Sequence, residues 1–223
     1  HTRLVSDWSS DVCSSDLFGA THPENSRIYC NIAYLHMKKK KYEEALDNYN
    51  KALNTLKDIN NDAHPFVGDI YAKIANVYEA QSKYGAAIEA MTRAFKVYEQ
   101  NGDINAIAIG YNKLGSLYVL DMNFEEALKY FQRALNLASQ LFGSHGYQVA
   151  IVYHNLGYVL RLQEKFESAL EYYHLALEAK TELYGEKSEE VTKLCAEIGE
   201  TYERLGSYDK AEEYFRKAHN PSH

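Results

Sequence analysis

Apolar and small residues recur along the chain with helical spacing, and short polar segments interrupt them. Between Phe142 and Lys180, the large side chains Tyr153, Leu160 and Tyr173 each lie three or four residues from a small one. Spacings of three, four and seven residues place side chains on one stripe of an α-helix. This segment therefore predicts two amphipathic helices joined by a short polar turn.

The same pattern occurs five times in the chain. A Tyr/Phe-x-x-Ala motif opens the second helix of each copy, at intervals of 42, 40, 42 and 42 residues, with its alanine at Ala45, Ala87, Ala127, Ala169 and Ala211. Twelve residues before each alanine stands a second small residue: Ala33, Ala75, Gly115, Gly157 and Gly199. Aromatic residues share fixed positions around these small ones, which accounts for twelve of the twenty tyrosines. A period of a few tens of residues indicates a solenoid, in which the small residues let two helix backbones approach closely.

The five repeats predict ten helices, over Glu24–Lys39, Tyr42–Leu56, Pro65–Gln81, Tyr84–Glu99, Ile104–Leu120, Phe124–Leu141, Tyr147–Leu162, Phe166–Leu183, Ser188–Leu205 and Tyr208–His219. Three similar loops each contain a glycine that stands 26 residues before a motif alanine: Gly19, Gly143 and Gly185. A glycine at the end of a long helix predicts a left-handed cap there.

The order small–aromatic–alanine–aromatic–alanine resembles the tetratricopeptide repeat family over residues 18–219. The proline that usually follows the second helix is absent, and longer segments between repeats extend the period from 34 to about 42 residues. The 42-residue copies are similar to the repeats of kinesin light chains, and the 40-residue third copy to those of spindle-orientation adaptors. The resemblance implies an all-α, right-handed α-solenoid of five helix pairs, with repeats at about 24–62, 63–102, 103–145, 146–186 and 187–219.

The N-terminal segment does not fit this pattern. Residues 7–17, DWSSDVCSSDL, resemble the in-frame translation of a short-read sequencing adapter. We therefore leave residues 1–17 out of the fold as an artefactual or disordered leader, and expect the chain to be a fragment of a longer protein. Without the charges of this leader, the formal net charge of −7 becomes about −5. Residues 220–223 are expected to fray.

Charge and composition exclude several classes of function. The chain is acidic and has no concentrated basic face, which argues against binding to nucleic acid. It has no run of about 18 apolar residues, so no membrane span is expected. Its three cysteines form no CxxC motif, which favours a reducing, cytoplasmic location.

The sequence gives no indication of catalysis. It contains none of the motifs HExxH, GxSxG, GxGxxG or the phosphate-binding loop, and its nine histidines are scattered. Cys30 and Cys195 are about four repeats apart, so they do not predict a zinc site. We therefore expect no catalytic site, no metal and no cofactor.

The resemblance implies instead that the first helices line a concave groove. Positions two before and one after each small residue would face it, together with others along the same side. The resulting peptide-binding candidates are Arg27, Asn31, Tyr34, Lys73, Asn76, Asn112, Lys113, Ser116, His154, Asn155, Tyr158 and Arg161. An asparagine amide offers a donor and an acceptor to a peptide backbone, and arginine or lysine would attract acidic side chains.

These residues predict a non-catalytic protein-interaction scaffold that binds an extended peptide, possibly an acidic one, in the groove. The kinesin-light-chain resemblance leaves open a fragment of a cargo adaptor. A third alternative is a regulatory arm of a multidomain enzyme or transcription regulator. Each of the three requires a protein or peptide partner.

Overall fold

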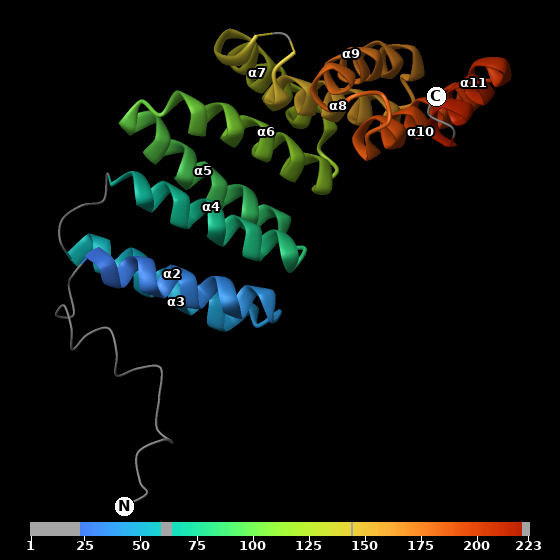
Figure 1. The fold of residues 1–223 in the computed structure, drawn as a ribbon. Helices are drawn as coiled ribbons and strands as arrows, with labels where there is room; N and C mark the ends of the chain where they lie inside the picture. The colour runs from blue at the N-terminus through green and yellow to red at the C-terminus, as the bar shows by residue number, and fades with distance from the viewer. Residues whose placement is uncertain (1–22, 59–63, 144, 220–223) are drawn as a thin grey trace, which may run out of the picture. The chain divides into compact units, whose positions relative to one another are not determined.

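The computed structural model describes residues 23–58, 64–143 and 145–219. The chain forms two compact units, which we treat separately (Figure 1). The N-terminal unit ends at Asp103 and the C-terminal unit begins at Ile104. The predictions for residues 1–17, Gly19 and residues 220–223 fall outside the described residues.

All regular secondary structure in the described part of the chain is α-helical. The N-terminal unit contains α2 (Pro23–Lys38), α3 (Tyr42–Asp58), α4 (Pro65–Ala80) and α5 (Tyr84–Asn101). The C-terminal unit contains α6 (Ile104–Leu120), α7 (Phe124–Phe142), α8 (Tyr147–Leu162), α9 (Phe166–Tyr184), α10 (Glu189–Arg204) and α11 (Tyr208–His219). Each predicted helix is confirmed, with both ends within two residues of the expected positions.

Consecutive helices pack as pairs, as the repeat predicts. The most extensive contacts join α2 to α3, α4 to α5, α6 to α7, α8 to α9 and α10 to α11. Within the N-terminal unit α3 also contacts α4, and within the C-terminal unit α7 contacts α8, α9 contacts α10 and α6 contacts α8. Each unit is thus a stack of helix pairs, and the predicted all-α repeat-solenoid class is confirmed.

An aromatic ring of the second helix lies directly on the small residue of the first. A Cβ added to Gly157 would stand 2.6 Å from Cδ1 of Tyr173 and 3.1 Å from the carbonyl oxygen of Ala169. Equivalent rings cover Gly115 and Gly199, sixteen residues before Phe131 and Phe215. The close approach that the small residues predict is therefore present. At each of these glycines, an aromatic ring fills the space that a side chain would need.

Buried side chains also connect one pair to the next. In the C-terminal unit, Phe131 of α7 belongs to the same core cluster as Val152, Leu156 and Val159 of α8. Full burial of a side chain of this size stabilises a fold by roughly 1.5–3 kcal/mol. Each pair therefore depends on its neighbour for part of its stability, as expected for a repeat protein.

The turn inside each pair contains one residue with a left-handed backbone. These residues are Lys40, Ser82, Met122, Glu164 and Gly206, with φ between 58° and 81°. In each turn the next amide closes the helix end; for example, Lys165 N–H donates to the Leu160 carbonyl oxygen at 2.9 Å. Only the last of the five positions is a glycine, so the helix pair imposes this conformation on residues that do not prefer it.

The glycines between pairs differ from the prediction. Gly143 and Gly185 do have positive φ values, 76° and 83°. Their ψ values, 177° and 157°, are extended and not left-handed helical. The predicted left-handed cap is therefore wrong at both residues, because the chain leaves the long second helix in an extended direction. This backbone region is essentially restricted to glycine.

A histidine between two tyrosines joins the last three helices. His174 of α9 places Nε2 3.1 Å from the Tyr202 hydroxyl of α10 and Nδ1 3.3 Å from the Tyr214 hydroxyl of α11. The two tyrosine rings stack with centroids 5.6 Å apart. Burial lowers the pKa of His174, and the charges of Lys210 and Lys217 lower it further. The folded chain therefore favours a neutral imidazole here.

The seating of rings on glycine gives a first prediction. Gly157→Ala should destabilise the protein by about 1–3 kcal/mol, because the new methyl group overlaps Tyr173. Gly85→Ala is the matched control, since nothing lies within 4 Å of a Cβ at this helical glycine. The control should be neutral or up to about 1 kcal/mol more stable. Urea unfolding measures both, and equal effects would show that no close approach exists at Gly157.

The histidine between the tyrosines gives a second prediction. The pKa of His174 is lower in the folded chain than its ordinary value of 6.5, so the unfolded chain binds the proton more readily. The stability that follows is present above about pH 6.5 and is lost as the pH falls through the folded pKa. His174→Gln keeps a hydrogen-bonding side chain and does not titrate. Between pH 8 and pH 5, the midpoint temperature of thermal unfolding should therefore fall more steeply for the wild type than for the variant. Parallel curves for the two proteins would contradict the lowered pKa of His174.

Candidate functional site on the first helices

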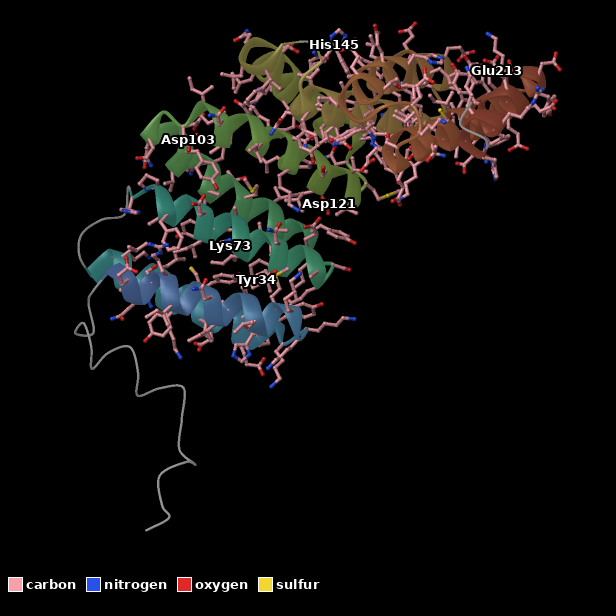
Figure 2. All side chains as sticks on the ribbon, in the orientation of Figure 1. Tyr34, Lys73, Asp103, Asp121, His145 and Glu213 are labelled. Carbon is pink, nitrogen blue, oxygen red and sulfur yellow. The ribbon has the colours of Figure 1, made fainter. Side chains whose placement is uncertain are left out.

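The N-terminal unit carries five of the predicted contact residues. Arg27, Asn31 and Tyr34 are exposed on α2. The contacts that the structure gives them run within this helix: Arg27 lies 3.6 Å from Glu24, and the Lys38 ammonium lies 5.2 Å from the centre of the Tyr34 ring. On α4, Lys73 is exposed and Asn76 is half-buried. Figure 2 shows the side chains around Tyr34 and Lys73.

In the C-terminal unit, the structure brings two predicted asparagines together. Asn155 Nδ2 of α8 donates to Asn112 Oδ1 of α6 at 2.9 Å. Both side chains are half-buried. Ser116 is occupied within its own helix, where its hydroxyl donates to the Asn112 carbonyl oxygen at 3.1 Å. The predicted residue Lys113 is half-buried beside them.

A mainly apolar pocket of about 230 Å³ opens beside the asparagine pair. It lies between α6, α7 and α8, and its lining residues are Ala108, Ile109, Asn112, Ala138, Tyr147, Gln148, Ile151 and Val152. Ile109 and Tyr147 are more than half exposed, so the pocket has an accessible apolar rim. One of the two paired amides is thus part of the pocket wall.

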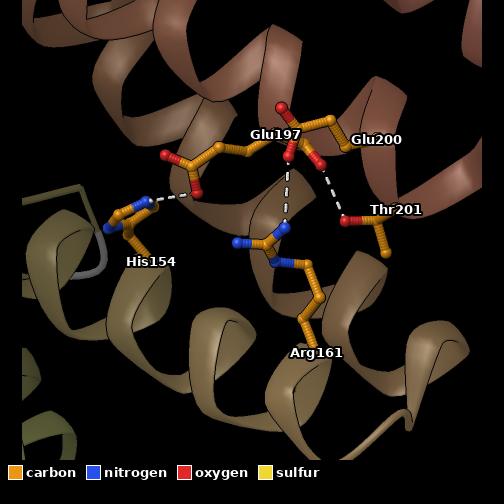
Figure 3. Close-up of polar contacts among 5 residues, drawn as sticks. All are labelled: His154, Arg161, Glu197, Glu200 and Thr201. Carbon is orange, nitrogen blue, oxygen red and sulfur yellow. Dashed lines mark hydrogen bonds and ion pairs between the residues drawn. The ribbon is translucent and has the colours of Figure 1, made fainter. Parts of the chain in front are cut away.

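Charged side chains connect the other side of α8 to α10 (Figure 3). His154 Nε2 lies 2.9 Å from Glu197 Oε2, and Arg161 Nη1 donates to Glu200 Oε2 at 3.2 Å. Thr201, one turn after Glu197, donates its hydroxyl to the Glu197 carbonyl oxygen at 2.7 Å. The predicted contact residues His154 and Arg161 are therefore brought to carboxylates of the protein itself.

Glu197 is the centre of this charged group. Burial raises its pKa, but His154, Arg161 and Lys180 together lower the pKa below the ordinary value for glutamate. Burial lowers the pKa of Lys180, which the charge of Glu197 opposes. The fully buried Tyr173 lies beneath this group, where burial and then the charge of Glu197 raise the pKa of its phenol. The arrangement keeps Glu197 ionised near neutral pH.

Tyr158, the last predicted contact residue, lies at the edge of this group. Its ring is partly exposed, and the Arg161 guanidinium lies 5.5 Å from the ring centre. Arg161 is therefore placed between an aromatic ring of its own helix and a carboxylate of α10. This position leaves Tyr158 as an apolar contact surface on α8.

Sequence reasoning placed the α8 residues on one face but did not identify their partners on α10. Glu197 stands two residues before Gly199, as Asn155 stands two residues before Gly157. The 42-residue period therefore indicates that Glu197 belongs to the same face. The period does not show which side chain of α8 contacts Glu197, since His154 and Asn155 are neighbours in the sequence and lie at nearly the same height on the helix.

One group in the described residues could hold a metal ion by its ligand types. His145, Glu178 and Glu182 place ligand atoms within 4.8 Å of one another, and all three side chains are exposed. His145 Nδ1 lies 3.4 Å from Glu182 Oε2, which an ordinary ion pair accounts for. Exposed acidic groups commonly occur without an ion, so the group supports no assignment.

Comparison with family models identifies one match, to the tetratricopeptide repeat, over residues 14–100, 106–182 and 148–220. No curated protein sequence gives a significant match. Within the described residues, no helix combines the length and the apolar character needed to span a bilayer.

Solved structures share the arrangement of helices. BtubC (BKLC) from P. vanneervenii is 25% identical with a TM-score of 0.76, over 83% of this chain and 75% of that chain. The TPR-like kinesin light chain repeats of Podosopora anserina are 14% identical with a TM-score of 0.73, over 88% and 94%. The Rap conjugation gene regulator of plasmid pLS20, in complex with the Phr* peptide, is 21% identical with a TM-score of 0.64, over 87% and 52%.

The charged group on α8 and α10 generates a third prediction. Glu197→Gln removes the carboxylate that His154 contacts and should lower stability by about 1 kcal/mol at pH 7. Because the pKa of Glu197 is lowered on folding, this contribution is present above the ordinary value of 4.5 and is lost as the pH falls through the folded pKa. Urea unfolding at pH 7 and pH 3 measures the difference. The exposed Glu171→Gln serves as the control, and an equal loss in both variants would contradict the role of the pair.

Proposed function

The chain belongs to the tetratricopeptide repeat family, and from this premise we propose that its C-terminal unit binds an extended peptide segment of a partner protein against α6 and α8. Proteins of this family are generally non-catalytic scaffolds for protein interactions. The observation that carries the finer proposal is the Asn112–Asn155 pair at the wall of an apolar pocket.

The asparagine pair suits recognition of a peptide backbone. The bond between the two amides uses one hydrogen of Asn155 and one acceptor site of Asn112. Each amide has two hydrogens and two acceptor sites, so both retain capacity for a further bond. The mutual bond also fixes how the two amides are oriented, which lowers the entropy cost of binding. Peptide N–H and C=O groups match this chemistry whatever the side chains of the peptide.

The pocket suits one apolar side chain of the same peptide. Asn112 belongs to both the pair and the pocket wall, so a backbone held by the amides passes the pocket opening. Successive side chains of an extended peptide point to opposite sides. A residue directed toward α7 would meet Ala108, Ala138 and Val152, which are buried and apolar. The proposed ligand therefore needs one apolar anchor residue, and the side chains at its other positions are not specified by these contacts.

A structural neighbour supports a peptide as the partner. The Rap conjugation gene regulator was solved with the Phr* peptide bound. At 21% identity this neighbour shows a shared fold, and the bound peptide belongs to that protein alone. The contact residues proposed for this chain rest on its own amides and pocket. In the N-terminal unit, Arg27, Asn31, Tyr34, Lys73 and Asn76 form a second proposed contact face of the same kind.

Peptide binding tests this proposal directly. A synthetic heptapeptide array is probed with the wild type and with Asn112→Ala and Asn155→Ala. Each substitution should lower the affinity for the bound peptides about five- to tenfold, because one or more hydrogen bonds to the peptide backbone are lost. Asn136→Ala on α7 is the matched control, since Asn136 is exposed and its Oδ1 accepts a hydrogen bond from Gln132 of the same helix. Unchanged binding in both test variants would rule out the proposed contact.

A further inference from the structure

Two carboxylates of α10 occupy positions of the proposed ligand-binding face. Glu197 stands two residues before Gly199 and Glu200 one residue after it. The corresponding residues of α8, relative to Gly157, are Asn155 and Tyr158. The repeat therefore places these acidic groups where the neighbouring repeat presents an amide and an aromatic ring.

Each carboxylate contacts a side chain of α8 that an acidic peptide would otherwise bond. Glu197 lies 2.9 Å from His154, and Glu200 lies 3.2 Å from Arg161. The Arg161 side chain is only 25% exposed, and those of His154 and Glu197 are 26% and 29% exposed. The His154–Glu197 pair is therefore partly shielded from water, whereas Glu200, at 55% exposed, and the pairs on α11 are accessible to it. The groups that face Glu197 are His154 and Arg161 of α8 and Lys180 of α9.

We propose that Glu197 and Glu200 act as built-in acidic ligands, which compete with acidic side chains of a bound peptide for His154 and Arg161. The C-terminal unit then binds neutral peptides in preference to acidic ones. This inference rests on the proposed function and adds the charge class of the ligand. For Arg161, it reverses the sequence-based expectation that arginine attracts acidic side chains of the peptide.

Competition of this kind favours the group that belongs to the protein. A tethered carboxylate is present at an effective concentration in the millimolar range, whatever the concentration of the peptide. A peptide carboxylate that displaces Glu197 also leaves a half-buried carboxylate without its partner, which is unfavourable. An acidic side chain in this part of the ligand therefore adds repulsion from α10 without gaining a free cation.

The test compares matched peptides on proteins of equal net charge. The probe is a heptapeptide array in which every glutamate-containing peptide has a glutamine-containing twin. The test protein carries Glu197→Gln and Glu200→Gln. The control carries Glu212→Gln and Glu213→Gln, which remove two carboxylates that also pair with cations, Arg216 and Lys217, but on the exposed surface of α11.

The ratio of acidic to neutral binding is the readout. We expect a ratio at or below one for the wild type and the control, and an increase of about fivefold for the test protein. An unchanged ratio in the test protein, with neutral peptides still bound, would refute the inference and leave the proposed function intact. Equal increases of this ratio in the test and control proteins would show that only net charge matters, and would also refute the inference. Loss of all peptide binding in every protein would overturn both proposals.

A second variant keeps the test decisive if the double substitution disturbs folding. Arg161→Gln in the wild type should change the acidic-to-neutral ratio by less than twofold, because Glu200 already neutralises the guanidinium through its bond to Nη1. The same substitution in the test protein should abolish the fivefold gain. A large loss of acidic binding on Arg161→Gln in the wild type would show that the cation is available to ligands, and would overturn the inference.

Discussion

The contact of an aromatic ring with a glycine determines how each helix pair of the C-terminal unit is built. Tyr173 covers Gly157 so closely that even a methyl group would overlap the ring. This contact sets the distance between α8 and α9, and it leaves the opposite side of α8 for polar residues. His154, one turn before Gly157, lies with its ring centre 5.8 Å from that of Tyr173, whereas Asn155, two residues before Gly157, reaches Asn112 of α6.

This constraint explains why the helices could be predicted and some of their ends could not. The small–aromatic pattern is specific, because each of the last three copies places a ring sixteen residues after a glycine and against it. The turn conformations follow from tertiary geometry instead. Met122 and Glu164 take a left-handed backbone that their side chains do not favour, whereas Gly143 and Gly185 take an extended one with positive φ. Local residue preference was therefore a poor guide wherever the packed pairs dictate the path of the chain.

The candidate site also combines features that the sequence pattern predicts with features that only the packing determines. Register alone placed Asn112, Asn155 and Arg161 on first helices, because a 42-residue period carries each position from one helix to the next. It could not predict which side chains meet across that gap. The bond from Asn155 to Asn112 and the contact of His154 with Glu197 both span 43 residues, one more than the period. Such diagonal contacts depend on the offset between neighbouring helices and on side-chain rotamers, which a linear pattern does not contain.

For the proposed peptide ligand, charge would act at two ranges, and both would disfavour acidic side chains. At short range, Glu197 contacts His154 and Glu200 pairs with Arg161, so a peptide carboxylate would compete with carboxylates of the protein itself. At long range, the chain has a formal net charge of −7, and a field of this sign slows the approach of an acidic peptide. Salt screens the long-range part within about 10 Å at 0.1 M, but it weakens partly buried pairs much less. Amides and an apolar pocket are insensitive to both effects. If this face binds a peptide as proposed, its selectivity would follow from hydrogen-bonding geometry and shape, with charge acting mainly to exclude acidic ligands.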